Sequence, residues 1–247
     1  LVPVIQVPQN SASAQVPLMG SVTATTISAA AGETDPGADF ASTLPSNTAI
    51  TIALDLIAAR TTVRDLGNID FNDIGRILGN SVANAWDKAV TTTFGALTSQ
   101  TSLGAAGTLT VPEIFTAIGT IRGNGETGDL FGIVGTNTYA ALMASIGGAA
   151  FAGGEFQNSA MRNGYFGHVG GVPLYVSSYL NDTDMGTVGK APAAAIMSRD
   201  AVKSVQQGGG LNVEFARRAE AVGFDIVASL AAGVSMVDVT RGVFIEQ

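Results

Sequence analysis

One six-residue stretch, GNGETG at positions 123–128, matches the G-x-G-x-x-G pattern with which many proteins bind the pyrophosphate of a dinucleotide. That chemistry requires the glycines to lie between a strand and the start of a helix, because the helix amides then face the phosphates. Here the apolar pattern places a helix before the glycines and a strand after them. The motif therefore predicts a helix end followed by a turn, rather than a nucleotide site.

The other residues that could carry chemistry are few. GTVGK at 186–190 lacks both the first glycine and the Ser or Thr of a phosphate-binding loop. His168 is the only histidine, so no two-histidine metal motif exists and a catalytic triad would depend on this residue alone. We interpret it as a turn or interface residue. The absence of cysteine excludes disulfides and thiolate catalysis.

Carboxylates are the remaining candidates for a metal site. Two groups could offer oxygen ligands to calcium: Asp182 with Asp184, and Glu33 with Asp35 and Asp39. Neither group has the spacing of a calcium-binding loop, which favours solvated acidic tips. The sequence therefore predicts no catalytic residue, no cofactor and no metal ion.

Composition bounds the class of protein. The chain has 247 residues, 46% of them hydrophobic, enough for the core of one large or two modest domains. Its 12 basic and 20 acidic residues give a net charge of −8, which disfavours binding of a phosphate backbone over the whole surface. The longest nearly apolar run, 226–237, is too short to span a membrane. Because the chain begins at Leu1 rather than at Met, we expect that a segment precedes it.

The longest regular pattern runs from residue 71 to 94. Apolar residues recur there at steps of three and four, which predicts an amphipathic helix about 35 Å long, roughly twice the length of a mean helix. Asn68 or Asp70 could cap its start and Gly95 could end it. A helix of this length is expected to be a scaffold. Its predicted core residues are Phe71, Ile74, Leu78, Val82 and Trp86.

The residues before this helix predict extended structure. Residues 1–20 contain three prolines and predict an arm that reaches a neighbouring surface. Residues 21–50 have β-leaning ends around an acidic, turn-rich middle, which predicts a long hairpin or excursion loop; a disordered surface loop is the alternative. Residues 51–64 predict a β-segment that leads into the helix.

The residues after the helix predict a small α/β layer domain, because helical and strand patterns alternate between 110 and 200. The predicted elements are a helix from Pro112, a strand at 130–135, a helix from Thr136 or Asn137, and strands at 170–180 and 193–198. Beyond Gly210 the pattern predicts a strand or short helix and then closing strands.

In the order of its predicted elements, the chain resembles the major capsid proteins of tailed phages, which have the Hong Kong 97-type fold. The resemblance is carried by TVPEIFTAIGTIRGNGETGDLFGIVGTNTYAALMAS, FGHVGGVPLYVSSYL, AAAIMSRDAVKSV and GVSMVDVTRGVFIEQ. Each motif is weak alone, but their order and spacing are specific. The resemblance implies an α+β fold with an N-terminal arm (1–20), an extended loop (21–50), a peripheral domain (51–100 and 211–247) with its spine helix at about 70–94, and an axial domain (101–210).

The resemblance also implies a function. It predicts a subunit that is not an enzyme and assembles with itself into the hexamers and pentamers of an icosahedral or prolate head, formed in the host cytoplasm. The head would enclose double-stranded DNA without sequence-specific binding. The implied partners are a portal and, in some members, scaffolding and cement proteins, with no membrane. The predicted intersubunit contacts are Val4, Ile5, Val7, Val16, Leu18, Asp35, Asp39, Phe40, Leu44, Arg60 and Arg64.

Two further expectations concern variation within this class. Some members cross-link subunits through a lysine of the extended loop, but the only lysines here are Lys88, Lys190 and Lys203, so a non-covalent shell is predicted. The nearest alternative is the shell of an encapsulin compartment, which shares the fold and encloses enzymes. The alternative from another class is a small α/β nucleotide-binding enzyme that uses GNGETG.

Overall fold

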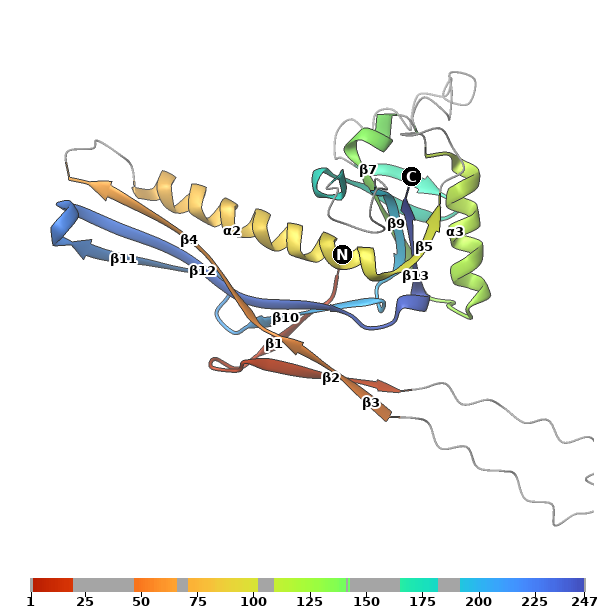
Figure 1. Cartoon of the computed structure of the whole chain (residues 1–247), viewed down its shortest axis with the longest axis horizontal. Coiled ribbons are helices and arrows are strands. Elements are labelled where there is room, and N and C mark those ends of the chain that lie inside the picture. Colours follow the sequence, from red (N-terminus) through yellow and green to blue (C-terminus); the bar gives the residue numbers. More distant parts are fainter. Residues whose placement is uncertain are drawn as a thin grey trace, which may run out of the picture.

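The computed structural model describes residues 2–19, 47–65, 71–101, 109–140, 142, 165–181 and 192–246. The predicted mixture of helices and sheets is confirmed (Figure 1). Among the described residues, α2 (Phe71–Thr93) and α3 (Val111–Gly123) are the helices with defined bounds, and residues 136–140 are also helical. The short 3-10 turns are Phe94–Ala96, Ser178–Asn181, Ala219–Ala221 and Val239–Arg241. The strands are β1 (Val4–Val7), β2 (Ser13–Met19), β3 (Asn47–Ala53), β4 (Asp55–Arg64), β5 (Thr98–Thr101), β6 (Leu130–Gly135), β7 (Tyr165–Val169), β8 (Val172–Ser177), β9 (Pro192–Ser198), β10 (Val202–Gln207), β11 (Asn212–Arg218), β12 (Gly223–Met236) and β13 (Gly242–Glu246).

The long helix predicted from periodicity is α2. Its buried stripe is narrower than predicted and follows one row of residues four apart: Leu78 and Val82 are buried, and Ile74 and Trp86 are partly buried beside them. Phe71, predicted as core, is 43% exposed because it lies in the first turn, at the end of the helix.

The end of α2 also differs from the prediction. Gly95 does not terminate the helix in a left-handed conformation. Instead the chain tightens into a 3-10 turn, Phe94–Ala96, which buries Phe94 completely. The proposed caps at the start of the helix, Asn68 and Asp70, lie outside the described residues.

Helix α2 packs on a five-stranded sheet with the order β1-β10-β12-β11, in which β4 also pairs with β12. We call this sheet with α2 the five-stranded unit. Strand β12 holds this sheet together, because it pairs antiparallel with β11, β10 and β4. Alternate residues of β12, namely Ile226, Ala228, Leu230 and Ala232, are buried toward the helix.

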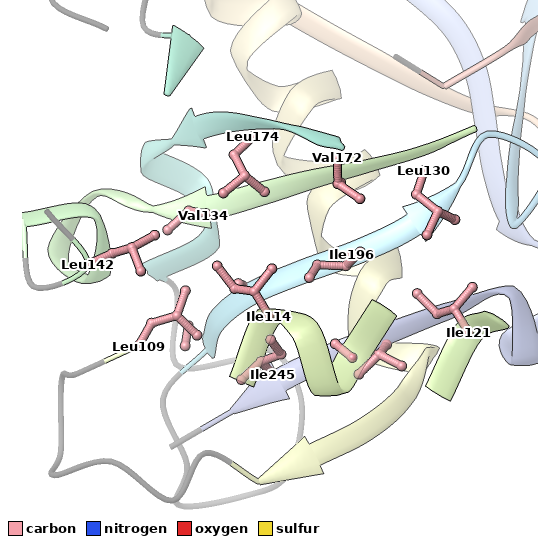
Figure 2. Packing of buried hydrophobic residues seen from close by; sticks show 14 residues of the cluster. Leu109, Ile114, Ile121, Leu130, Val134, Leu142, Val172, Leu174, Ile196 and Ile245 are labelled. Carbon is pink, nitrogen blue, oxygen red and sulfur yellow. The ribbon is translucent and has the colours of Figure 1, made fainter. Parts of the chain in front are cut away.

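A second sheet has the order β5-β13-β9-β6-β8-β7 and packs against α3. We call this sheet with α3 the six-stranded unit. Its central strands β6, β9 and β13 are buried at every position, as expected for a sheet covered on both faces. Figure 2 shows one face, where Ile114 and Ile121 of α3 lie in one buried cluster with Leu130, Ile196 and Ile245 of the sheet.

Helix α3 begins where its sequence predicts, and a capping box also marks its start. Pro112 lies in the first turn, and a capping box closes the start: the amide of Thr110 donates to Glu113 Oε2 at 2.8 Å, and the Thr110 side chain accepts from the backbone at Glu113. The T-x-x-E pattern at 110–113 is the sequence signal for this capping box. The strand predicted at 130–135 is β6, and residues 136–140 are helical as predicted.

The strand predicted at 170–180 is β8, and it forms a hairpin with β7, a strand that the sequence did not predict. Strands β7 and β8 pair antiparallel on either side of Gly170 and Gly171, whose φ angles are 59° and 79°. Positive φ at both central residues is the turn that matches the twist of a hairpin, and glycine adopts it without steric cost.

The N-terminal arm contributes to the sheets of its own chain. Strand β1 pairs parallel with β10, and β2 pairs antiparallel with β3 in a two-stranded ribbon that crosses the five-stranded sheet (Figure 1). Residues 13–19 therefore pair with residues 47–53, the last part of the predicted hairpin and the residues after it. Pro17 is tolerated in β2 because the ribbon has an open edge. Residues 20–46, most of the predicted loop, lie outside the described residues.

Each sheet combines strands from both of the predicted domains. Strand β10, predicted within the axial part, belongs to the five-stranded sheet. Strands β5 and β13, predicted within the peripheral part, belong to the six-stranded sheet. The sequence therefore crosses between the units several times, which binds the two sheets into one body.

Candidate functional site

The predicted contact residues of the arm fall into two groups. Val4 is 49% exposed, and Leu18 is partly exposed. Val16, by contrast, is 7% exposed and packs with Ile52 and Val205 of its own chain. Val16, predicted as an intersubunit contact, thus anchors the ribbon to its own chain in this structure.

Ile5 and Val7 are intermediate in exposure between Val4 and Val16. Both pack beside the same small cluster from β1, while the side chains of alternate residues face outward. The four predicted contacts of the extended loop, Asp35, Asp39, Phe40 and Leu44, lie outside the described residues.

Arg60 and Arg64 lie on the face of the five-stranded sheet that α2 does not cover. Five residues of β4 on this outer face are exposed: Leu56, Ala58, Arg60, Thr62 and Arg64. Leu56 is the extreme case, with 72% of its surface exposed. In the described part of the chain no helix lies against this face of β4, β11 and β12 (Figure 1). The outer face is thus a broad, mixed polar and apolar surface with room for a partner.

Asp225 organises the charges of the outer face. Its carboxylate accepts from Thr62 Oγ1 at 2.5 Å and pairs with Arg60, while Arg218 Nη1 lies 3.8 Å away. The hydroxyl of Thr62, assisted by Arg60, holds the pKa of Asp225 below its ordinary value of 3.8 despite partial desolvation. Arg60 is therefore locked in place on β4, whereas Arg64 has no ion pair with any described residue.

Aromatic residues gather at the end of the five-stranded unit where α2 begins. The Phe71 ring meets the rings of Phe215 and Phe224 edge-on, with centroids 6.4 and 5.7 Å away. Arg217 lies over the Phe224 ring at 5.0 Å and pairs with Asp65 at 2.8 Å. Phe215 remains 56% exposed. Sequence reasoning missed this cluster, although the alternation in NVEFARR (212–218) was a signal that one side of the strand faces the helix.

The glycine motif at 123–128 is a helix end, as predicted. Helix α3 stops at Gly123, Gly125 has a φ of 87° and donates its amide to the Arg122 carbonyl, and β6 follows at Leu130. The glycines therefore do not precede a helix, and the geometry required for dinucleotide binding is not formed.

Other sites considered from sequence gain no support. Within the described residues, no three His, Asp or Glu side chains gather as metal ligands. His168 lies exposed on β7, and Asp182, Asp184, Glu33 and the GTVGK stretch are outside the described residues. Among the described helices, none combines the length and apolar character needed to cross a bilayer.

Comparison with known proteins gives a consistent answer only at the level of structure. No family model and no curated relative matches the sequence. Among solved structures, the capsid of cyanophage P-SCSP1u is similar over 99% of this chain and 85% of its own, with a TM-score of 0.73 and 17% identity. The capsid of Ralstonia phage GP4 is similar over 99% of this chain and 86% of its own, with a TM-score of 0.71 and 14% identity. The structure from Mycobacterium phage Che8 is similar over 96% of this chain and 85% of its own, with a TM-score of 0.68 and 15% identity.

This chain has the fold of a phage capsid subunit. The predicted Hong Kong 97-type capsid fold is thereby confirmed. The likeness spans the five-stranded unit, the six-stranded unit and the ribbon together, because it covers nearly the entire chain. At such low identity the correspondence lies in the arrangement of elements, not in individual side chains.

Proposed function

We propose that this chain is a phage major capsid protein that assembles with itself into a closed shell and has no enzymatic role. The observation that carries the proposal is the likeness to capsid subunits over 99% of the chain. In this reading the five-stranded unit is the peripheral domain and the six-stranded unit is the axial domain, with the boundaries adjusted to the strand pairing described above.

The exposed surfaces support assembly. A projecting ribbon and an uncovered sheet face are both costly in an isolated subunit, because each leaves apolar area or open strand edges in water. Contact with neighbours would cover them. Many modest contacts in a closed shell reinforce one another, so no single interface needs to be very tight.

The proposed intersubunit contacts follow from exposure. On the described residues they are Val4, Leu18, Arg60 and Arg64, and the acidic loop is proposed to contribute Asp35, Asp39, Phe40 and Leu44. The remaining expectations stand as proposals: hexamers and pentamers in an icosahedral or prolate head, assembly in the host cytoplasm, non-covalent stabilisation, enclosure of double-stranded DNA, and portal, scaffolding or cement proteins as partners.

The direct test is the size and shape of the purified protein, measured by light scattering and then by electron microscopy of the same fraction. We expect closed polyhedral particles or capsomer rings that dissociate in boiling detergent. Enclosed DNA distinguishes a phage head from an enzyme-filled compartment. A stable monomer under all conditions, with a thermal shift on adding nucleotides, would refute the proposal in favour of a nucleotide-binding enzyme.

Arg64 provides a test of the outer face. Because it is exposed and forms no ion pair with a described residue, Arg64→Glu should leave the subunit folded and reduce the yield of particles. The matched control is Arg76→Glu on α2, a substitution of the same charge away from this face. Equal particle yields for the two variants would show that the outer face is not a contact surface.

A further inference from the structure

A hollow of ≈ 390 Å³ in the six-stranded unit brings together positive charge from separate parts of the chain. It is lined by Arg122 from α3, His168 from β7 and Arg199 from the corner after β9, together with Asp129 before β6. Two guanidinium groups therefore face one carboxylate in a protein whose net charge is −8. Such a local reversal of sign favours an anionic ligand.

The two arginines differ in how they are held. Arg122 Nη1 donates to the carbonyl oxygens of Glu126 at 2.9 Å and Gly128 at 2.8 Å, which orients the guanidinium without neutralising its charge. Arg199 is exposed and forms no hydrogen bond or ion pair with a described residue. Neither arginine lies within ion-pair distance of Asp129 in the part of the chain that the structure describes, so both charges remain available to a ligand.

The neighbouring acidic groups are already occupied. Glu126 accepts from the Gly128 amide at 2.7 Å and pairs with Arg241 at 3.4 Å. Asp200, next to Arg199, pairs with Lys203, and the hydrogen bond from Lys203 holds its pKa below the ordinary value of 3.8. These carboxylates therefore do not cancel the charge of the hollow.

Apolar residues also contribute to the lining and the rim of the hollow, beside its charged residues. Ile118 and Pro173 line it, and the ring of Phe115, 51% exposed, lies against Gly170 at its edge. A Cβ at Gly170 would lie only 2.7 Å from that ring, so the glycine is what allows the aromatic side chain to sit there. The site thus offers positive charge beside an exposed aromatic surface. It suits a peptide that carries a carboxylate next to an apolar residue better than a small inorganic anion.

We propose that this hollow binds the acidic segment 33–40, ETDPGADF, of a second copy of the chain. That segment carries three carboxylates and ends in Phe40, so it matches both the charge and the aromatic rim. It belongs to the stretch that joins β2 to β3, whose ribbon projects below both units in Figure 1. The inference rests on the proposed function, because it supplies one contact of the shell.

The first experiment uses the unassembled full-length chain and a fluorescent peptide of residues 31–42, AGETDPGADFAS. We expect saturable, salt-sensitive binding, and about tenfold weaker binding when Gln and Asn replace the three acidic residues of the peptide. Arg199→Gln should weaken binding by a similar factor, whereas Arg76→Gln, an exposed arginine outside the hollow, should not.

Equal binding by both peptides, or by wild type and Arg199→Gln, would overturn the proposal. So would displacement of the peptide by inorganic phosphate at concentrations far below those needed for sodium chloride.

A double-mutant cycle on assembly provides a second measurement. Arg199→Gln and the pair Asp35→Asn with Asp39→Asn should each lower particle yield, and their combination should cost little more than either alone. Fully additive effects would contradict a direct contact. Particles formed without charge-dependent peptide binding overturn this site and leave the proposed function intact. Charge-dependent binding by a chain that never forms particles supports the site and refutes the proposed function.

Discussion

The two units of the chain solve the problem of burying a sheet in different ways. In the six-stranded unit, alternate residues of β9 enter opposite cores: Ala194 and Ile196 face α3, while Ala195 and Met197 pack with Phe94 and its neighbours. In the five-stranded unit, one face of β4 and β12 packs on α2, and the other face is exposed along β4 and partly exposed along β12. The six-stranded sheet is thus covered on both faces, whereas the five-stranded sheet is covered by a helix of the described residues on one face only.

This difference shows where stability and where assembly reside. A sheet buried on both faces carries its own stability, since its hydrophobic residues have left water within a single chain. A sheet buried on one face, with Leu56 72% exposed on the other, gains when another surface covers it. We therefore expect core substitutions to act mainly on folding in the six-stranded unit and surface substitutions to act mainly on assembly in the five-stranded unit.

The largest effect is expected in the doubly covered sheet. Phe244 is completely buried in β13, so Phe244→Ala should lower the free energy of unfolding by about 3–5 kcal/mol through lost burial and a cavity. Urea unfolding of the subunit, followed by the fluorescence of Trp86, measures this directly. The matched control is Phe215→Ala in the five-stranded unit, where the ring is 56% exposed and the expected loss is under about 1 kcal/mol. Similar losses in the two variants would show that the units do not differ in this way.

A smaller but sharp effect is expected where the ribbon crosses β12. A Cβ at Gly233 would lie 1.9 Å from the Ala53 carbonyl oxygen, so Gly233→Ala must push β3 away from β12. We expect a loss of about 2–3 kcal/mol in unfolding free energy. Gly75→Ala on α2 is the control, since nothing lies within 4 Å of its added methyl group and alanine favours the helix by about 1 kcal/mol. Opposite signs of the two changes in urea midpoint are the expected result; a stabilised Gly233→Ala subunit would contradict the tight crossing.

The smallest effect concerns the charges of the outer face. Because the pKa of Asp225 is lowered in the folded chain, the unfolded chain takes up the proton first as the pH falls. Its contribution to stability is therefore complete above the ordinary pKa of 3.8, declines below that value and is lost once the pH passes the lowered pKa. Urea midpoints measured across this range should fall less steeply with pH for Asp225→Asn than for wild type. Parallel curves would show that the Thr62 and Arg60 contacts do not stabilise the charged form.

Local patterns predicted the elements whose signals lie within a few residues. The periodicity of 71–94 predicted α2, Pro112 predicted the start of α3, and the run LFGIVG predicted β6. The resemblance of ordered motifs predicted the capsid fold. The hairpin at Gly170 and Gly171 was missed although its signal was local, because the glycine-rich stretch that contains β7 favoured a loop.

Contacts between distant residues were beyond the sequence. The pairing of β1 with β10 joins residues about two hundred positions apart, and the packing of Val16 of β2 on Val205 of β10 is equally remote in sequence. The exposure of Phe71, predicted as core, likewise depends on how α2 is placed over its sheet. Of the hollow at Arg122 and Arg199, only the separate arginines were visible in the sequence, because the turns between elements bring them together.

By itself, the sequence determined the helices, most of the strands, the acidic character of the chain and the lack of a catalytic motif, because each depends on composition or on spacing within a few residues. The tertiary structure alone decided which strands share a sheet, which sheet face stays uncovered and which charges meet in one hollow. Those features depend on pairings between distant segments, which are set by the packing of the whole chain rather than by any local pattern.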